Sequence, residues 1–369
     1  MMNTAKLPIP KPYISAIHAY TPGKAKADDG RALIKLSANE NPLGCSMAAR
    51  DAMAGEAGTT ARYPDPASNA LRAALAATYG LEAEQIVCGT GSDELLNLIA
   101  AGYAGLNDEI IHVHYGFAVY DIAARKVGAH VIVAPDRDYG TDVDALLALV
   151  TAKTRLVYLA NPNNPTGTVM TAAEVARLHA GLPSDVILVL DQAYGEYLVD
   201  DGAAAFDLAR QYDNVLITRT FSKIYGLAAE RIGWAYGKPH LIDTLNRIRG
   251  PFNVTAAGQS AAIAALGDQD FVRRSRAHNI EWLGWMNDQI AALSNHGLRA
   301  VPSAANFLLV LFEGAVSAQT ADRELIDAGY VVRHLPGMGL GHALRITIGT
   351  QAENEGFMAA LRAILEKAR

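Results

Sequence analysis

The feature that most constrains the fold is an alternation of short apolar runs with helical segments between about residue 68 and residue 236. Short runs rich in β-branched residues are typical of buried strands, and the segments between several of them have helical character. We expect strands at 85–89, 109–114, 130–134, 155–160, 186–190, 214–218 and 232–236. This βαβ rhythm predicts an α/β protein with a mostly parallel seven-stranded sheet flanked by helices.

The bulk composition restricts the class of protein. The chain has 369 residues, half of them hydrophobic, which is enough for a large core and two domains. A net charge of −6 and a pI near 5.9 argue against a nucleic-acid partner. Cys45 and Cys88 are the only cysteines, so we expect neither a disulfide framework nor a metal site. Because we find no secretory signal and no membrane-spanning apolar run, we expect a cytoplasmic protein.

The pattern divides the chain into three parts. Residues 1–36 are rich in proline and predict an N-terminal arm, and residues 37–253 form a large domain around the alternating pattern. Residues 254–369 begin with long helical stretches and predict a smaller α+β domain. Its expected strands are 306–311, 330–333 and 343–348, and its later helices are 318–328 and 352–367.

Residues suited to chemistry stand directly after several of the expected strands. They are Gly89–Asp93, Tyr115, Asn161–Gly167, Asp191–Tyr194 and Ser222–Lys223. Ligands of such sheets bind beyond the carboxyl ends of the strands, so these residues should meet at one edge. The pattern therefore predicts a single site at that edge.

Lys223 and Asp191 carry the strongest chemical implications. A lysine at the end of a core strand is costly to bury as a bare charge, but it is suited to forming an imine with an aldehyde. Asp191 closes the most apolar strand, where a carboxylate needs a cationic partner such as a protonated ring nitrogen. A lone lysine is more often a solvated surface residue, so this interpretation depends on the other residues.

A phosphate could bind near the first of these strands. Gly91, Ser92 and Asp93 open a helix directly after a strand, and backbone N–H groups at a helix start attract anions. An ordinary capped helix start would have the same residues. Ser222 and Arg231 could add a hydroxyl and a cation to this phosphate site.

Three other residues suit the ring of a flat ligand. Tyr115 could stack on the ring, and Asn164 and Tyr194 could hold an oxygen substituent, although a core tyrosine or a plain turn would look alike. Together with the lysine, the acid and the phosphate site, they describe a site for pyridoxal phosphate. Farther along the chain, Arg333 and Arg345 could bind a substrate anion.

Seven stretches resemble one protein family, in order over nearly the whole chain: 37–44, 62–66, 89–94, 161–167, 191–194, 220–233 and 333–350. They are similar to the fold-type I pyridoxal-phosphate-dependent aminotransferases of class I and II. The turn N-P-N-N-P-T-G and the segment S-K-x-x-G-L-A-x-x-R are specific to that superfamily. The stretch Ser37–Gly44, the R-Y-P-D-P loop and the closing Leu344–Thr350 point to the histidinol-phosphate aminotransferase branch.

The resemblance implies a role for each predicted site residue. The implied catalytic residues are Lys223, which would bind the cofactor aldehyde and carry the proton, Asp191, which would pair with the pyridine nitrogen, and Tyr194. The implied cofactor-binding residues also include Gly91, Ser92, Asp93, Tyr115, Asn164, Ser222 and Arg231. The implied substrate-binding residues are Tyr20, Asn39, Arg333 and Arg345. The family also implies a homodimer in which Tyr63 reaches the cofactor phosphate of the partner subunit.

The activity implied by the resemblance is transamination of L-histidinol phosphate with 2-oxoglutarate, which gives imidazole acetol phosphate and L-glutamate in histidine biosynthesis. An aromatic amino-acid aminotransferase on the same fold is the first alternative, because two arginines could receive either a phosphate or a carboxylate. A phosphothreonine-type decarboxylase and a non-catalytic cofactor-binding regulator are further alternatives. The identity of the amine substrate and the oligomeric state stay open at the level of sequence.

Overall fold

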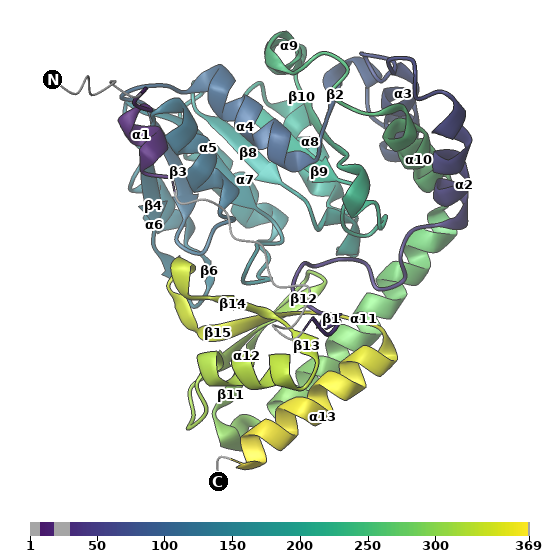
Figure 1. Cartoon of the computed structure of the whole chain (residues 1–369). Helices are drawn as coiled ribbons and strands as arrows, with labels where there is room; N and C mark the ends of the chain where they lie inside the picture. Colours follow the sequence, from purple (N-terminus) through teal and green to yellow (C-terminus); the bar gives the residue numbers. More distant parts are fainter. Residues whose placement is uncertain (1–7, 18–29, 368–369) are drawn as a thin grey trace, which may run out of the picture.

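A seven-stranded sheet and a smaller four-stranded sheet organise the chain, and the small sheet lies below the large one in Figure 1. The computed structural model describes residues 8–17 and 30–367. Each sheet has its own hydrophobic core, and a long helix runs from one unit to the other. The predicted α/β class is confirmed.

The large sheet has the strand order β2-β10-β9-β8-β7-β3-β4. Its strands are β2 (Ile86–Gly89), β3 (Glu109–Val113), β4 (His130–Ala134), β7 (Thr154–Ala160), β8 (Ile187–Asp191), β9 (Val215–Thr220) and β10 (Gly233–Gly237). The five strands from β9 to β4 are parallel, whereas β10 is antiparallel to both of its neighbours. Every residue of β8 and β9 is buried, as expected for strands that are covered on both faces.

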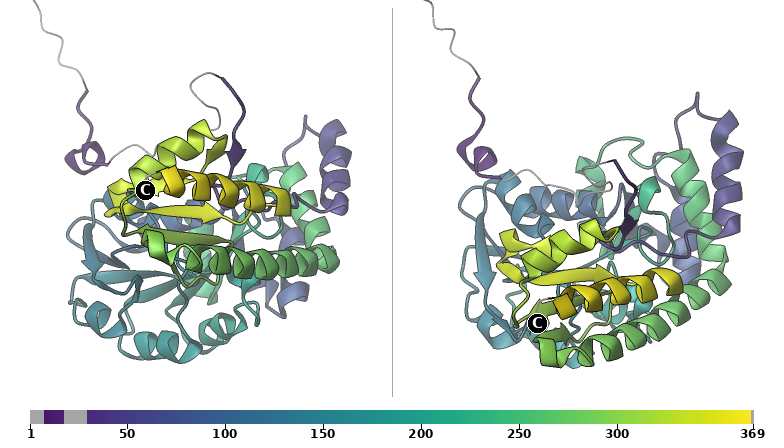
Figure 2. Two further views of the ribbon diagram at one scale, coloured as in Figure 1. Left: turned by 90° about the horizontal axis from the view of Figure 1, so that it is seen from below. Right: turned by 60° about the horizontal axis from the view of Figure 1, so that its bottom comes forward.

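The small sheet is antiparallel and has the order β11-β12-β15-β14. Its strands are β11 (Leu298–Val301), β12 (Phe307–Phe312), β14 (Arg333–Leu335) and β15 (Leu340–Thr347). The helices α11 (Gln269–Ala291), α12 (Ala318–Asp327) and α13 (Gln351–Lys367) pack on it. The right view of Figure 2 shows α11 and α13 side by side. The core on the other face includes Tyr115 and Tyr139 from the large unit, so it joins the two units.

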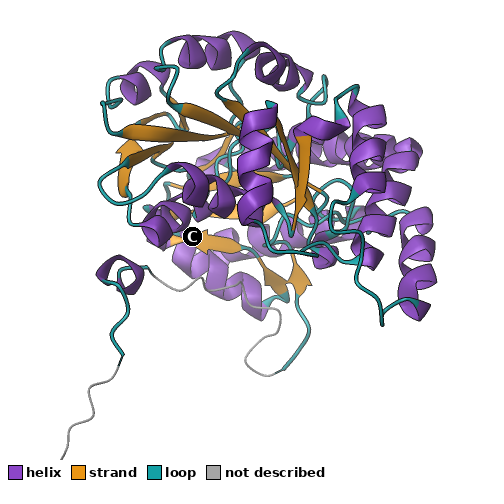
Figure 3. Ribbon diagram, turned by 90° about the horizontal axis from the view of Figure 1, so that it is seen from above, coloured by secondary structure: helices purple, strands orange, loops and turns teal. Residues whose placement is uncertain are grey.

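Helices cover both faces of the large sheet (Figure 3). One face packs against α4 (Ser92–Tyr103), α5 (Val119–Val127) and α9 (Pro239–Ile248). The other face packs against α3 (Asn69–Tyr79), α6 (Val143–Leu147), α7 (Ala172–Ala180), α8 (Ala203–Gln211) and α10 (Ala256–Gly267). Ligands of such sheets bind between these layers, at the carboxyl ends of the strands.

The remaining elements are short. They are α1 (Pro12–Ser15), β1 (Ile34–Lys35), α2 (Met47–Gly55), β5 (Asp136–Arg137), β6 (Gly140–Thr141), β13 (Tyr330–Val331) and the 3₁₀ helices η1 (Glu56–Gly58), η2 (Ala83–Gln85), η3 (Gly195–Tyr197), η4 (Ala228–Glu230), η5 (Ser294–His296) and η6 (Pro336–Met338). The strand β1 pairs in parallel with β13, which attaches the start of the chain to the small unit. In the described part of the chain, no helix is both long and apolar enough to cross a membrane.

The structure differs from the sequence predictions in the small unit. The expected strand 330–333 is two strands, β13 and β14, which pair with different partners. The strand β11 was not predicted, because Leu298–Val301 is only four residues long and carries an exposed arginine. The helical stretch 254–294 contains α10 and α11, and Asp268 ends the first and caps the second. The division of the chain at residues 36 and 253 stays a prediction.

Candidate active site

A cavity lies where three parallel strands end. Ala160, Asp191 and Thr220 are the last residues of β7, β8 and β9, and all three line it. The complete lining is Ser92, Asp93, Phe117, Ala160, Pro162, Asn164, Asp191, Ala193, Tyr194, Thr220, Ser222, Lys223 and Arg231. Residues predicted from four separate stretches of sequence thus meet in one cavity.

Asp191 is a buried carboxylate in the wall of this cavity, with 3% of its surface exposed. Its Oδ2 accepts a hydrogen bond from the hydroxyl of Tyr120 at 2.8 Å, and its Oδ1 accepts one from the backbone N–H of Ala193 at 3.2 Å. Burial raises the pKa of Asp191 to about 6, and the hydrogen bond from Tyr120 works in the opposite direction. The carboxyl is therefore mostly ionised at pH 7 but is partly protonated near pH 6, and a cationic ligand group would favour its ionised form.

Lys223 approaches the same cavity from the loop after β9. Its Nζ lies 3.4 Å from the carbonyl oxygen of Ala38 and 5.6 Å from the ring centre of Tyr194. Burial, with a smaller contribution from the nearby Arg345, lowers the pKa of Lys223 to about 8, although the carboxylates of Asp93 and Glu40 act in the opposite direction. A substantial fraction of the amine is therefore neutral near pH 8 and able to react with a carbonyl group.

A candidate anion site lies at the N-terminus of α4. The guanidinium of Arg231 donates to the hydroxyl of Ser222 at 3.1 Å and lies 3.5 Å from the carboxylate of Asp93. Thr220 also donates to the Ser222 hydroxyl, so the proton of Ser222 can point into the cavity. Arg231 can stand here because β10 is antiparallel and begins at the edge where its neighbours end.

Close backbone packing shapes this anion site. A Cβ atom on Gly91 would lie 2.6 Å from the guanidinium of Arg231, and one on Gly233 would lie 2.4 Å from the backbone nitrogen of Ser92. Gly91 also has a φ of +84°, which disfavours residues with side chains. The two glycines thus allow the helix start and the arginine to meet around one small anion.

A hydrogen-bonded chain links the two sheets beside the cavity. Asn39 is buried and donates to the hydroxyl of Tyr194 at 2.7 Å, while its Oδ1 accepts from Thr347 of β15. Burial raises the pKa of Tyr194 to about 12, so its phenol keeps its proton and can donate it to a ligand oxygen. Arg345 donates to Oδ1 of Asn164 at 2.6 Å, so Asn164 can offer its NH₂ group to a ligand.

Of the two aromatic residues after β3, Phe117 lines the cavity and Tyr115 does not. After β3 the chain turns, and the N–H of Gly116 bonds to the carbonyl of Val113. The ring of Tyr115 then stacks with His114 at 4.4 Å and with Tyr139 at 5.4 Å, in the core that faces the small sheet. Tyr115 therefore does not line this cavity, and its stacking on a ligand ring stays a prediction.

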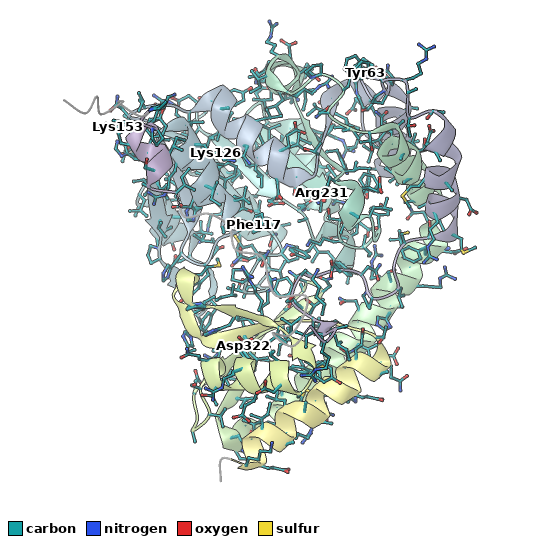
Figure 4. All side chains as sticks on the ribbon, viewed as in Figure 1. Tyr63, Phe117, Lys126, Lys153, Arg231 and Asp322 are labelled. Carbon is teal, nitrogen blue, oxygen red and sulfur yellow. The ribbon has the colours of Figure 1, made fainter. Side chains whose placement is uncertain are left out.

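Three other predicted residues lie away from the cavity or outside the described residues. Tyr63 is 81% exposed and stacks on Phe252 at 4.4 Å, and Figure 4 shows it at the outer edge while Phe117 and Arg231 lie centrally. Arg333 faces Arg345 across β14 and β15 but lines a neighbouring depression that also includes Phe117. Tyr20 lies outside the described residues.

Sequence reasoning missed Phe117 and Tyr120 as site residues. The sequence did contain an indication for Phe117, since it is a second aromatic residue two positions after Tyr115. There was none for Tyr120, because this residue looks like one of the apolar positions of α5 and its contact with Asp191 spans 71 residues of sequence.

The donor set fits pyridoxal phosphate. A reactive amine, Lys223, and a buried carboxylate, Asp191, line one cavity, which suits an aldehyde and a protonated pyridine nitrogen. Ser92, Ser222 and Arg231 provide hydroxyls and a cation for a phosphate, next to the helix start that the glycines leave accessible. Phe117 offers a ring face for a flat heterocycle.

The chain is similar to known proteins over most of its length. The profile of the family "Aminotransferase class I and II" matches residues 31–361. The chain is 61% identical over 360 residues to a histidinol-phosphate aminotransferase of Sphingopyxis alaskensis, covering 96% of this chain and 97% of that protein. It is 55% identical to one of Zymomonas mobilis, covering 97% and 98%. A crystal structure of histidinol-phosphate aminotransferase from Sinorhizobium meliloti in complex with pyridoxal-5'-phosphate is similar, with a TM-score of 0.90, 30% identity and coverage of 99% and 100%.

Proposed function

The chain belongs to the class I and II aminotransferases, and from this premise we propose that it transfers the amino group of L-histidinol phosphate to 2-oxoglutarate. The products are imidazole acetol phosphate and L-glutamate, and the reaction serves histidine biosynthesis. Relatives up to 61% identical over nearly the full length carry the name of this activity. Pyridoxal phosphate is the cofactor of the reaction.

One observation carries the proposal. Lys223 and Asp191 line the same small cavity, and the anion site of Ser222 and Arg231 lies on that cavity too. Such an arrangement presents an amine, an acid and a phosphate site to one ligand, which a plain nucleotide or sugar phosphate would not require. The two residues would hold the aldehyde and the ring nitrogen of the cofactor.

The other lining residues would complete the cofactor site. Ser92, Ser222 and Arg231 would bind the phosphate, and the NH₂ of Asn164 with the hydroxyl of Tyr194 would hold the ring oxygen. Phe117, in place of the predicted Tyr115, would stack on the ring. When bound, pyridoxal phosphate supplies an electron sink for the charge that develops at the substrate carbon.

The chain itself supplies the proton transfer. Lys223 has a pKa near 8, so its Nζ can take a proton from the substrate carbon and release it again near neutral pH. Tyr194 keeps its own proton because burial raises its pKa to about 12, and it can donate a hydrogen bond throughout the cycle. Asp191 would hold a protonated ring nitrogen by its charge.

Arginine residues of the small sheet would receive the anionic ends of the substrates. Arg345 lies next to Asn164 and Tyr194, and its guanidinium carbon lies 5.3 Å from the ring centre of Phe307, so its position is restricted. Arg333 is its cross-strand neighbour and lies on the depression beside Phe117. Asn39 and Tyr20 are proposed to bind substrate as well, on the family resemblance.

A substrate panel with purified protein tests the activity. We expect glutamate to form from histidinol phosphate and 2-oxoglutarate much faster than from phenylalanine or tyrosine as amino donor. Lys223→Ala should lose both the activity and the cofactor bond that borohydride reduces, whereas Lys153→Ala, at the outer edge of the molecule in Figure 4, should keep both. A preference for the aromatic amino acids would indicate the alternative aminotransferase, and carbon dioxide release without 2-oxoglutarate would indicate a decarboxylase.

The protein also works, we propose, as a homodimer in the cytoplasm. Tyr63 does not line the cavity of its own chain and presents its ring outward, which suits a contact with the site of a second subunit. The side chains of Met47 and Phe252 are exposed as well and add apolar area to the surface of the protein. Both cysteines are free thiols, which fits a reducing compartment.

A further inference from the structure

The hydroxyl of Tyr120 contacts the carboxylate of Asp191 from outside the cavity. It lies on α5, on the face of the large sheet that α4 and α9 also cover, and its hydroxyl donates to Oδ2 of Asp191 at 2.8 Å. Tyr120 does not line the cavity, so it would not touch the cofactor or the substrate. Asp191 lines the cavity, so this hydrogen bond connects the interior of the protein with the ligand site.

The ring of Tyr120 is held in place by packing. It is fully buried and stacks almost parallel on Tyr158 of β7, with ring centres 4.9 Å apart and an interplanar angle of 3°. Phe117 meets its edge at 5.8 Å. The Tyr158 hydroxyl donates elsewhere, to the carbonyl of Leu96 at 2.7 Å. Of the two stacked tyrosines, therefore, only Tyr120 donates a hydrogen bond to the carboxylate of Asp191, whereas Tyr158 donates to the backbone.

We propose that Tyr120 is a positioning residue that fixes the orientation of Asp191 and keeps its carboxylate ionised for the ring nitrogen of the cofactor. With Oδ2 bound to Tyr120 and Oδ1 bound to the N–H of Ala193, the carboxyl group cannot rotate without losing a bond. A hydrogen bond donated to a carboxylate stabilises its charged form. This inference rests on the proposed function, because it assigns a cationic ring nitrogen as the partner of Asp191.

The direction of the hydrogen bond is fixed by the chemistry of the phenol. Burial and the neighbouring carboxylate raise the pKa of Tyr120 far above its ordinary value, so its hydroxyl is protonated and donates to the ionised carboxylate of Asp191 at neutral pH. Other groups also act on Asp191: burial and Asp93 of α4 raise its pKa, and the Ala193 N–H and Thr218 of β9 lower it. Tyr120 makes the largest of the contributions that lower this pKa.

The pair of stacked tyrosines provides a matched experiment. Tyr120→Phe and Tyr158→Phe each remove one buried hydroxyl from the same stack, but only the first removes a bond to Asp191. In cofactor-free protein with ¹³C-labelled aspartate side chains, the signal absent from Asp191→Asn reports the titration of this carboxyl. We expect Tyr120→Phe to raise the pKa of Asp191 by about one pH unit or more, and Tyr158→Phe to leave it unchanged.

Cofactor binding gives a second measurement. Tyr120→Phe should weaken pyridoxal phosphate binding by about tenfold at pH 5, because a rise of one unit in the pKa of Asp191 lowers its ionised fraction about tenfold there, and it should have little effect at pH 8, where Asp191 is ionised in both proteins. An equal shift in both variants, or an unchanged titration in Tyr120→Phe, would overturn the proposal. A wild-type protein that does not bind the cofactor at all would instead overturn the proposed function.

A third variant covers the case in which Tyr120→Phe does not fold. Site-specific replacement of Tyr120 by 3-fluorotyrosine keeps the ring and the hydroxyl but makes the phenol a stronger donor. The pKa of Asp191 should then fall below its wild-type value. A rise, or no change, in a folded protein would contradict the assignment of Tyr120 as the donor that sets the ionisation of Asp191.

Discussion

Nη1 of Arg345 donates a hydrogen bond to Oδ1 of Asn164 at 2.6 Å, and this bond joins the small sheet to the large sheet at the cavity. Nη2 of the same guanidinium donates to the carbonyl of Ser37 at 2.7 Å. The residue proposed to receive the substrate anion is thus already bonded to a residue proposed to hold the cofactor ring. Binding of a substrate to Arg345 can therefore alter the amide of Asn164 directly.

Replacement of Arg345 should impair catalysis more than it impairs folding. Arg345→Gln removes the charge for the substrate anion and a charge-assisted bond to Asn164, so we expect kcat/KM to fall by about 100-fold or more. Arg299→Gln is the matched control, since Arg299 lies on β11 of the same sheet and pairs with Asp138 and Glu313 at the surface. Steady-state kinetics should show no more than about a twofold change for that control. Equal losses in both variants would contradict a specific role for Arg345.

The two aromatic residues after β3 can be separated by leucine substitutions. Phe117→Leu should weaken retention of pyridoxal phosphate by about tenfold, because it removes the ring face from the cavity. Tyr115→Leu should reduce the thermal stability, because it disrupts the stack with His114 and Tyr139, but it should leave cofactor affinity nearly unchanged. Equilibrium dialysis and thermal unfolding measure the two effects. The reverse result would restore Tyr115 as the stacking ring.

The strand ends of the large sheet were predictable, whereas the directions of side chains in the turns were not. A closed apolar run such as Val186–Leu190 indicates where a strand ends, and the next residue, Asp191, must then lie at the edge of the sheet. The turn at Gly116 depends on contacts that no sequence periodicity encodes, so the sequence did not show that Phe117, rather than Tyr115, lines the cavity.

Long-range contacts account for the remaining gaps. Asn39 meets Thr347 across 308 residues of sequence, and Tyr120 meets Asp191 across 71. Nothing local to these residues predicts their partners, because the contacts exist only once both sheets have formed. Asn39 was assigned through the resemblance alone, and Tyr120 was not assigned at all.

The pKa of Lys223 predicts how the cofactor should attach to the protein. The reactive form is the neutral amine, and burial lowers the pKa to about 8, so its fraction should grow about tenfold per pH unit below pH 8 and then level off. Stopped-flow absorbance of cofactor-free protein mixed with pyridoxal phosphate measures this rate between pH 6 and 9. A rate that still rises about tenfold between pH 8 and pH 9 would indicate a lysine with an ordinary pKa.

Asp191 should make stability depend on pH in a defined direction. Its pKa is raised from 3.8 to about 6 in the folded protein. Its stabilising contribution to the free energy of unfolding is therefore fully present below pH 3.8 and is lost as the pH rises through about 6. The wild-type protein loses this stabilisation as the pH rises, and Asp191→Asn does not. The free energy of unfolding of Asp191→Asn, measured relative to wild type, should therefore increase by about 2 kcal/mol between pH 4 and pH 7.5. Urea unfolding of the cofactor-free proteins measures it. The exposed Asp185→Asn should show no such change.

A mixing experiment tests whether Tyr63 acts on a second subunit. Tyr63→Ala and Lys223→Ala should each have low activity as pure proteins, because every site lacks one required residue. In a mixed dimer, the chain with an intact Lys223 faces the chain with an intact Tyr63, so one of the two sites is complete. Random mixing makes about half of the dimers mixed, and we therefore expect recovery to about a quarter of the wild-type activity.

The recovery separates the proposed dimer from the alternatives. Tyr63 stacks on Phe252 at the surface of its own chain, so a role limited to that contact would leave the mixture as inactive as its components. Mixing Lys223→Ala with Asp191→Asn is the control, since both residues line the same cavity of one chain. Its mixed dimers contain no complete site, and their activity should stay at the background level. Recovery in the control would show that subunits share Lys223 or Asp191, and it would remove the basis for assigning them to one site.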